Sequence, residues 1–278
     1  MFLEKKLAEL SNVSVKPITY GEPTSASAYL LKEINLSIKQ GEWINLIGRN
    51  GSGKSTLARL IAGFGAMHVE GKVYKDESTR QVPMVLQQPD VSVVGATPWE
   101  DVVMMLEQHG MEGERIPQLA EDALRETGLH MRMHQPVETL SGGQKQLTAI
   151  AGCLAVQAPM LILDEITAML DPGACLHVME KVRDLNKRGV AVLWITQKLE
   201  ELAAGDRVLA LENGQIRFDG EAERLFERHS LEEKSSCEEL GFTAPYVIQT
   251  AWELQALGID LHPIPLTPEL LAKAVSGQ

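Results

Sequence analysis

A phosphate-binding loop constrains the fold of this chain more than any other feature of the sequence. Residues 48–56 read GRNGSGKST, directly after the apolar run Trp43–Ile47 and before a helical pattern that stops near Gly63. Glycines in such a loop let backbone N–H groups close around phosphate oxygens, while Lys54 and Ser55 serve phosphate and Mg²⁺. The residues expected to hold a nucleoside triphosphate are Gly48, Arg49, Asn50, Gly51, Ser52, Gly53, Lys54, Ser55 and Thr56.

Composition limits the partners of the chain. Its 278 residues suffice for one ordinary core and a small second unit. The formal net charge of −12 argues against binding to nucleic acid, which needs lysines and arginines against phosphates. No apolar run approaches the roughly 20 residues that span a bilayer, and charged residues interrupt Met1–Leu10, unlike a signal peptide. We therefore expect no nucleic-acid partner, no direct membrane insertion, and membrane association only through a partner protein.

The second half of the chain alternates between strand and helix patterns. Met160–Leu163 and Val190–Ile195 are continuous apolar runs, as expected of parallel strands that are covered on both faces. Helical patterns at Cys175–Asn186 and Lys198–Ala203 separate the later strands. This alternation predicts an α/β sheet.

Two other regions differ from that pattern. Residues 98–134 are rich in Met, Leu and Glu with glycine breaks, and they predict two or three helices in a helical subdomain. Near the end, the chain turns polar after Phe226 and resumes with an amphipathic stretch at Pro245–Leu257. We expect the tail, about residues 235–278, to form a separate small unit.

Two acids follow the predicted strand that ends at Leu163. Asp164 can hold Mg²⁺ through water, and Glu165 can polarise an attacking water. Acids at such a position are commonly only the start of a solvated loop. Their spacing after Leu140–Gln146, which reads LSGGQKQ, favours the functional interpretation.

The LSGGQKQ segment indicates how the nucleotide is used. Ser141, Gly142 and Gly143 would open a helix whose N-terminal donors can grip a phosphate. Upstream, Gln87 follows another strand-like run, and its amide can contact both metal and water. Downstream, Asp171 offers a carboxylate that could cross a dimer interface, although Asp-Pro pairs also form ordinary turns.

With these motifs in this order, residues from about 8 to 228 resemble the ATPase subunit of ABC transporters. The resemblance implies an α/β fold of the P-loop NTPase type, with a RecA-like core, an antiparallel β subdomain and a helical subdomain at about 98–155. It divides the chain into an ABC ATPase domain at 1–228 and a carboxy-terminal extension at 229–278. We expect the extension to serve in dimerisation or partner binding.

The same resemblance implies an ATP hydrolase that uses ATP and Mg²⁺. Two such subunits dimerise around two ATP molecules, each held between one phosphate loop and the other subunit's LSGGQ segment. Besides the phosphate loop, the implied nucleotide contacts are Ser141, Gly142, Gly143, Gln144, Asp171 and an aromatic residue, for which the candidate is Tyr20. The implied catalytic residues are Glu165, Gln87 and Gln197, and the implied metal ligands are Ser55, Gln87 and Asp164.

A narrower resemblance is to the ATPase component of energy-coupling-factor importers. The residues that carry it are Gln87 to Asp90, Asp101-Val102, Leu140–Gln146, Met169 to Pro172, and in the tail Leu240-Gly241, Ala244 to Tyr246 and Leu257 to Asp260. It implies a location on the cytoplasmic face of the cell membrane. The implied partners are a second ATPase subunit, a transmembrane coupling subunit and a substrate-binding membrane subunit for a vitamin or a metal ion.

Two positions leave alternatives open. Where the family carries a histidine against the γ-phosphate, this chain has Gln197, whose amide can donate a hydrogen bond but cannot relay a proton. Gln197 either substitutes adequately, because Glu165 supplies the carboxylate, or marks a catalytically weak subunit of a heterodimer. Tyr20 either stacks on adenine or is an ordinary loop residue. A third alternative is a soluble ABC ATPase without a transport role, against which the acidic charge and the single cassette argue.

Overall fold

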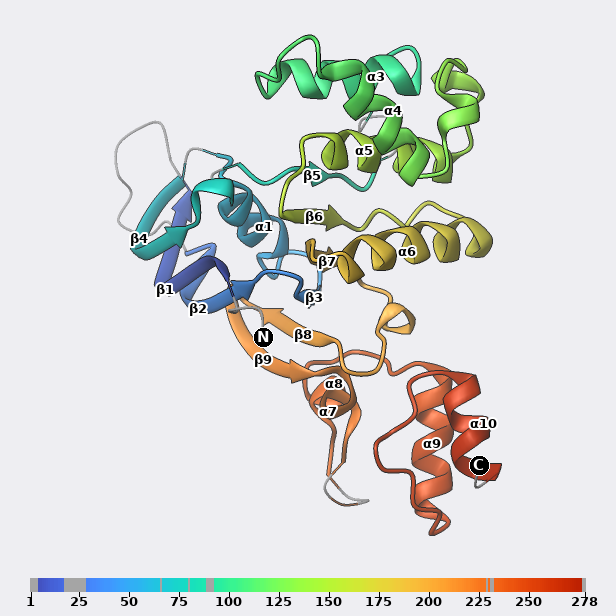
Figure 1. The fold of residues 1–278 in the computed structure, drawn as a ribbon. Coiled ribbons are helices and arrows are strands. Elements are labelled where there is room, and N and C mark those ends of the chain that lie inside the picture. Colours follow the sequence, from blue (N-terminus) through green and yellow to red (C-terminus); the bar gives the residue numbers. More distant parts are fainter. Residues whose placement is uncertain are drawn as a thin grey trace.

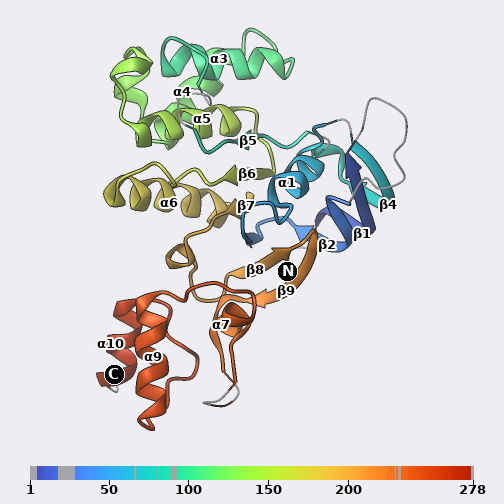
Figure 2. The same cartoon turned by 180° about the vertical axis from the view of Figure 1, so that it is seen from behind.

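The computed structural model describes residues 5–17, 29–65, 67–79, 81–88, 93–228, 230 and 233–276. Two β-sheets make up the centre of the molecule, and helices gather beyond both edges of the larger sheet (Figure 1). Seen from behind, α3, α4 and α5 again lie at one end, and α9 and α10 lie at the other (Figure 2). The two views confirm the predicted α/β architecture with a helical subdomain and a carboxy-terminal extension.

The larger sheet consists of β3 (Trp43–Ile47), β5 (Met84–Val85), β6 (Met160–Asp164), β7 (Ala191–Ile195), β8 (Arg207–Glu212) and β9 (Gln215–Glu221). Their spatial order is β5-β6-β7-β3-β8-β9. All neighbours from β5 to β8 pair in parallel, and only β9 runs antiparallel, to β8. The apolar runs of the sequence therefore lie in the middle of a parallel sheet, as predicted.

The smaller sheet is antiparallel. It contains β1 (Lys6–Pro17), β2 (Leu31–Lys39) and β4 (Met67–Lys75) in the order β2-β1-β4. Buried Ile34, Leu36 and Ile38 alternate along β2 with less buried residues, as in a strand that is covered on one face. Helix α1 (Lys54–Ala62) begins at the phosphate loop and packs into the same core.

Both faces of the larger sheet are covered. Along β7, Leu193 and Ile195 pack with α1 and the smaller sheet, whereas Trp194 points into the opposite cluster. Because side chains alternate between the two faces of a strand, one apolar run fills two cores. Asp164, the last residue of β6, reaches the carboxyl edge of the sheet, where the strand-to-helix loops gather.

A helical subdomain packs on the second face of the sheet, beyond β5. Its main helices are α3 (Pro98–Gln108), α4 (Ile116–Glu126) and α5 (Gly142–Ala155), with 3₁₀ turns η2 (His130–Arg132) and η3 (Val137–Thr139) between α4 and α5. A third short turn, η1 (Glu77–Thr79), follows β4. The sequence prediction of two or three helices over residues 98–134 is confirmed by α3, α4 and η2. Throughout the described chain, no helix combines the length and the apolar character that crossing a membrane requires.

Below β8 and β9, the tail shares a core with the sheet instead of forming the separate small unit expected from its composition. Helix α7 (Ala222–Phe226) follows β9, and the helices of the tail are α8 (Ser236–Glu239), α9 (Tyr246–Ala256) and α10 (Pro268–Ser276). Ile248 and Trp252 of α9 belong to one buried cluster with Ile47, Val208 and Ala210 of the sheet. The amphipathic pattern of the tail thus predicts the helix α9 but not the surface that covers it.

One predicted helix is wrong. Lys198–Ala203 forms only a single 3₁₀ turn, η4 (Leu199–Glu201), which follows helix α6 (Pro172–Lys187) and β7. Leu199 and Glu201 are both buried, so both side chains of the turn are directed into the protein. Tertiary contacts outweigh helix propensity here, as they often do in short segments.

Candidate nucleotide site

The phosphate loop forms one wall of a cavity of about 560 Å³ at the carboxyl edge of the sheet. All three of its glycines have backbone conformations that other residues avoid, with φ of +158° at Gly48, +80° at Gly51 and +110° at Gly53. A Cβ atom at Gly48 would lie 2.6 Å from the Leu211 carbonyl oxygen, and one at Gly53 would lie 3.0 Å from the Leu30 carbonyl oxygen. The loop can therefore follow this path only with glycine at both positions. Seven of its residues line the cavity, namely 50–56.

The side chain of Lys54 is buried at the floor of the loop. Its Nζ donates hydrogen bonds to the carbonyl oxygens of Gly48 (2.7 Å) and Arg49 (3.3 Å). Burial lowers the pKa of the Lys54 ammonium, and the charges of Glu165 and Asp164 oppose that shift. The buried Lys54 ammonium is shielded from water. An anion bound in the cavity could therefore form a strong, charge-assisted hydrogen bond with it.

The acidic pair reaches the same cavity from the end of β6. Asp164 Oδ2 accepts a hydrogen bond from Ser55 Oγ at 3.4 Å, and Glu165 Oε1 lies 4.0 Å from Lys54 Nζ. Burial, and next the charge of Glu165, raise the pKa of Asp164. Glu165 has a left-handed backbone with φ of +50°, a conformation that costs about 1 kcal/mol or more and persists where surrounding contacts impose it.

Gln197 follows β7 and faces this acid. Its Nε2 donates hydrogen bonds to Glu165 Oε1 at 2.6 Å and to Asn50 Oδ1 at 3.1 Å. Three motifs that are far apart in the sequence thus meet: the phosphate loop, the acidic strand end and the segment after β7. Gln87 lines the cavity as well, from the loop after β5.

The residues fit a nucleotide and a magnesium ion. The loop offers backbone donors without obstructing Cβ atoms, and the buried Ser52 hydroxyl has no hydrogen-bond partner among the described residues. Ser55, Gln87 and Asp164 line one cavity and present the oxygen ligands that Mg²⁺ prefers. They would hold the ion, and Lys54 would face the phosphates.

Several cavity residues are not marked by any sequence motif. They come from β2 and from the β8–β9 hairpin, which the fold brings beside the loop; the group comprises Tyr29, Leu30, Lys32, Asn213 and Gly214. Tyr29 is the aromatic residue of this group, and it lies in the cavity lining two residues before β2. Tyr20, the aromatic residue predicted from the sequence, lies outside the described residues.

Arg49 differs from the rest of the loop. Its side chain is exposed and lines a second cavity of about 350 Å³ between the loop and the tail, together with Leu240 and Phe242. A Cβ atom at Gly241 would lie 3.6 Å from Arg49 Nη1. Arg49 therefore lies beside the tail, whereas the next loop residues, Asn50 and Gly51, line the nucleotide cavity.

The LSGGQ segment lies elsewhere. Ser141 and Gln144 form a capping box at the start of α5: Gln144 N–H donates to Ser141 Oγ (3.3 Å), and Ser141 N–H donates to Gln144 Oε1 (2.9 Å). Together with Gly143 they line a separate cavity of about 210 Å³, and none of them is among the described residues that line the phosphate-loop cavity.

Asp171 caps the neighbouring helix. Its carboxylate accepts a hydrogen bond from the Ala174 N–H at 3.0 Å at the start of α6. A Cβ atom at Gly143 would lie 3.0 Å from the Ala174 Cβ, so glycine allows α5 and α6 to approach closely. Within one chain Asp171 therefore lies beside the LSGGQ segment and acts as a helix cap.

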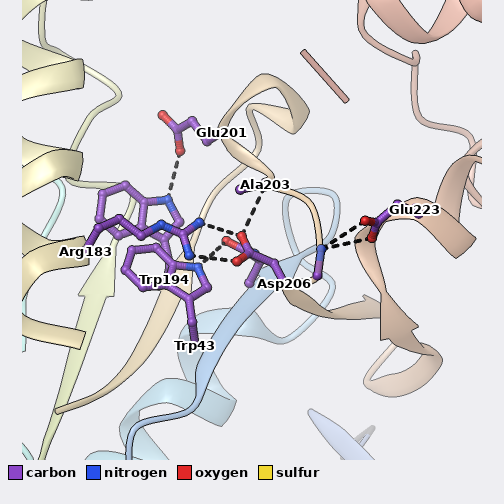
Figure 3. Close-up of polar contacts among 9 residues, drawn as sticks. Trp43, Arg183, Trp194, Glu201, Ala203, Asp206 and Glu223 are labelled. Atoms are coloured by element: carbon purple, nitrogen blue, oxygen red, sulfur yellow. Dashed lines mark hydrogen bonds and ion pairs between the residues drawn. The ribbon is translucent and has the colours of Figure 1, made fainter. Parts of the chain in front are cut away.

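A network of polar contacts gathers around Asp206, Arg183 and Glu201 (Figure 3). Asp206 accepts two hydrogen bonds from the Arg183 guanidinium, at 2.7 and 2.5 Å, and a third from Asn45 at 2.9 Å. The guanidinium also lies 3.5 Å from the centre of the Trp43 ring, which stacks on Trp194 with 5.4 Å between centroids. This network fixes α6 against β3, β7 and the start of β8.

Glu201 extends the network to the acidic loop. Its two carboxylate oxygens accept hydrogen bonds from Trp194 Nε1 (2.9 Å) and Thr167 Oγ1 (2.6 Å), and Lys198 Nζ donates to the Thr167 carbonyl at 2.8 Å. Thr167 lies two residues after Glu165, and Lys198 directly follows Gln197. The segments that carry the two facing side chains are therefore fixed to each other.

Comparisons with known proteins agree with this geometry. The ABC transporter family model matches residues 31–168. The energy-coupling factor transporter ATP-binding protein EcfA1 of Listeria monocytogenes is 38% identical over 243 residues, which cover 84% of this chain and 85% of that protein.

Two solved structures share the fold. One is cbiO1 from Clostridium perfringens, part of the ABC transporter complex cbiONQ, with a TM-score of 0.70 at 24% identity over 92% of this chain and 98% of that one. The other is the ATP-binding cassette MJ0796 in a dimeric, post-hydrolysis state bound to ADP and Pi, with a TM-score of 0.63 at 27% identity over 78% and 99%. The fold, the assembled phosphate site and the extent of the match together show that this chain belongs to the ATP-hydrolysing subunits of energy-coupling-factor ABC transporters.

Proposed function

We propose that this chain drives an importer by dimerising around two ATP molecules, each held between one subunit's phosphate loop and the other's Ser141 to Gln144. In this proposal it binds the cytoplasmic face of the cell membrane through a transmembrane coupling subunit. That subunit in turn carries a membrane protein that binds a vitamin or a metal ion. The second ATPase subunit is either a copy of this chain or a related one.

The observation that carries the proposal is the separation of the two nucleotide motifs. Ser141, Gly143 and Gln144 line a different cavity from the one that the phosphate loop forms. The N-terminal end of α5 is exposed at Ser141 and Gly142, so this end of the helix is accessible to a ligand from outside the chain. A second subunit would supply that ligand on its own phosphate loop.

Within each composite site, this chain's residues divide the work of hydrolysis. Lys54 and the loop amides bind and orient the phosphates, Glu165 orients the attacking water, and Gln197 holds Glu165 in place. Bound Mg²⁺, held by Ser55, Gln87 and Asp164, would neutralise charge on the phosphate oxygens. The MJ0796 dimer and the cbiONQ complex support the dimer and the membrane partners, respectively.

The dimer is tested by mixing two inactive variants. Lys54→Met disables the phosphate loop but keeps the LSGGQ segment, and Ser141→Arg does the reverse. If the motifs act across subunits, the mixed dimer contains one intact site and regains phosphate release, whereas neither variant alone does. Failure of every mixing ratio to restore phosphate release, with both variants folded, would contradict a composite site between two copies of this chain and leave only a related chain as the second subunit.

A second measurement addresses the membrane partners. Tagged chain recovered from a detergent extract should bring integral membrane proteins with it. Recovery of nucleic acid in place of membrane proteins would favour the ATPase without a transport role.

A further inference from the structure

Gln146 is a buried polar residue that the proposed division of labour does not use. It lies on α5, five residues after Ser141, and is 0% exposed. Its neighbours Leu147, Ile150 and Ala151 belong to the apolar core of the helical subdomain. A position of this kind would ordinarily hold an aliphatic residue, because burying an amide costs free energy unless it is hydrogen-bonded.

The amide of Gln146 is directed at the loop that carries Gln87. Its Nε2 lies 3.4 Å from the Leu86 carbonyl oxygen and 3.3 Å from the Gln87 carbonyl oxygen, close enough to donate to both. The loop directly follows β5 and places Gln87 at the nucleotide cavity. One side chain on the LSGGQ helix therefore contacts the backbone of Gln87, which the proposed function assigns to Mg²⁺.

The other end of the same amide is unsatisfied. Gln146 Oε1 is buried and has no hydrogen-bond partner within the described part of the chain. An orphaned buried acceptor is rare in folded proteins, and such groups call for a reason beyond packing. The two contacts of Gln146 Nε2 with the Leu86 and Gln87 carbonyl oxygens supply a reason to keep a polar side chain at this buried position.

We propose that Gln146 is a positioning residue for Gln87. By donating to two consecutive carbonyl oxygens, it fixes the backbone of residues 86 and 87 relative to α5. The Gln87 side chain is thereby held toward the cavity, and the loop is tied to the helix that begins at the LSGGQ segment. This inference rests on the proposed function, because it gives Gln146 a role only through Gln87.

Two substitutions separate hydrogen bonding from packing. Gln146→Met has a similar length without polar atoms, and Gln146→Glu keeps the shape but replaces the donor with an oxygen that faces two carbonyls. If the amide positions Gln87, kcat of both variants falls by about 10- to 100-fold, the range seen when hydrogen bonds that orient a metal ligand are removed. Because Met fills a similar volume without burying a polar or charged group, a pure packing role predicts that Gln146→Met keeps kcat near that of the unmodified chain.

A double-mutant cycle with Gln87→Ala gives the readout that a merely structural role would not change. Since Gln146 acts through the Gln87 side chain, adding Gln146→Met to Gln87→Ala should lower kcat by less than about twofold further, the non-additivity expected of coupled residues. Full additivity of the two effects would overturn the proposal. Cys153→Ala, a buried substitution on the same helix, controls for loss of stability, and its kcat should remain near that of the unmodified chain.

A measurement without nucleotide completes the test. Backbone hydrogen exchange of a peptide spanning residues 84–88 should be faster in Gln146→Met than in Cys153→Ala, because the carbonyl contacts that restrain the loop are lost. Equal exchange in the two variants would overturn the proposal. If instead the Lys54→Met and Ser141→Arg chains fail to complement each other while Gln146→Met and Gln87→Ala remain non-additive, the composite dimer fails and the positioning role stands.

Discussion

The side-chain amide of Gln197 donates a hydrogen bond to the Glu165 carboxylate, with 2.6 Å between Nε2 and Oε1. The same amide nitrogen lies 3.1 Å from Asn50 Oδ1, so the residue after β7 contacts both the acidic strand end and the phosphate loop. A hydrogen bond to a charged group is among the stronger ones that a protein makes. Gln197 therefore orients Glu165 even without a ring that could exchange a proton.

Replacing Gln197 should separate orientation from proton transfer. Gln197→Ala removes the donor and should lower kcat by about 10- to 100-fold, since a hydrogen bond to a charged group contributes about 1.5–3 kcal/mol. Gln197→His retains a ring N–H donor and should keep turnover within a few fold of the unmodified chain. Phosphate release at saturating ATP measures both. Unchanged turnover in Gln197→Ala would show that Glu165 needs no such partner.

Lys54→Met should have opposite effects on the free and the nucleotide-bound chain. Because burial disfavours the Lys54 ammonium, the nucleotide-free variant should unfold at the same temperature as the unmodified chain or higher. ATP at 100 times its Kd should raise the free energy of unfolding of the unmodified chain by about 2.7 kcal/mol, and this gain should disappear in the variant. Thermal unfolding with and without ATP checks both; a nucleotide-free variant that unfolds at a clearly lower temperature would contradict the first.

The buried ion pair of Arg183 and Asp206 should matter far more than a surface pair on the same helix. Asp206→Ala leaves the Arg183 guanidinium and the Asn45 amide without their acceptor and should lower the free energy of unfolding by about 3–5 kcal/mol. Asp184→Ala removes the exposed pair with Lys187 and should cost at most about 1 kcal/mol. Urea unfolding compares the two. Similar costs for both variants would show that the network adds little to stability.

The tail should lose stability in acid through Glu238. Two hydrogen bonds from the Arg228 guanidinium, at 2.9 and 2.6 Å, lower the pKa of Glu238 from 4.5 to about 2. A carboxyl group whose pKa falls on folding stabilises the folded chain above pH 4.5, and this contribution is lost as the pH drops toward 2. Glu238→Gln should therefore flatten the decrease in unfolding temperature over that interval. An equally steep decrease in the variant would assign the acid sensitivity to other groups.

The parts of the site that lie next to one another in sequence could be predicted, because their chemistry depends on local geometry. The phosphate loop requires glycine where a Cβ atom would meet the Leu211 carbonyl, and the acids must follow a buried strand to reach the carboxyl edge of the sheet. Gln197 was identified from the resemblance alone, as the residue at the position where the family carries a histidine. Its hydrogen bond to Glu165 was not predicted, because it depends on how two neighbouring strands end.

Contributions from distant segments could not be read from the sequence. Tyr29, Lys32 and Asn213 reach the cavity only because β2 and the β8–β9 hairpin pack beside the loop. The helix predicted at Lys198–Ala203 was wrong for a related reason. The Glu201 carboxylate is buried and accepts hydrogen bonds from Trp194 and Thr167, which lie outside that segment. Periodicity within a segment carries no information about such long-range partners.

The core that the tail shares with Ile47 affects how the chain can be divided. Ile47 precedes Gly48 directly, so the apolar cluster that receives α9 ends one peptide bond from the phosphate loop. A chain cut at residue 228 would expose that cluster and alter the support of the loop. We therefore expect a change in the nucleotide affinity of such a fragment for reasons unrelated to dimerisation.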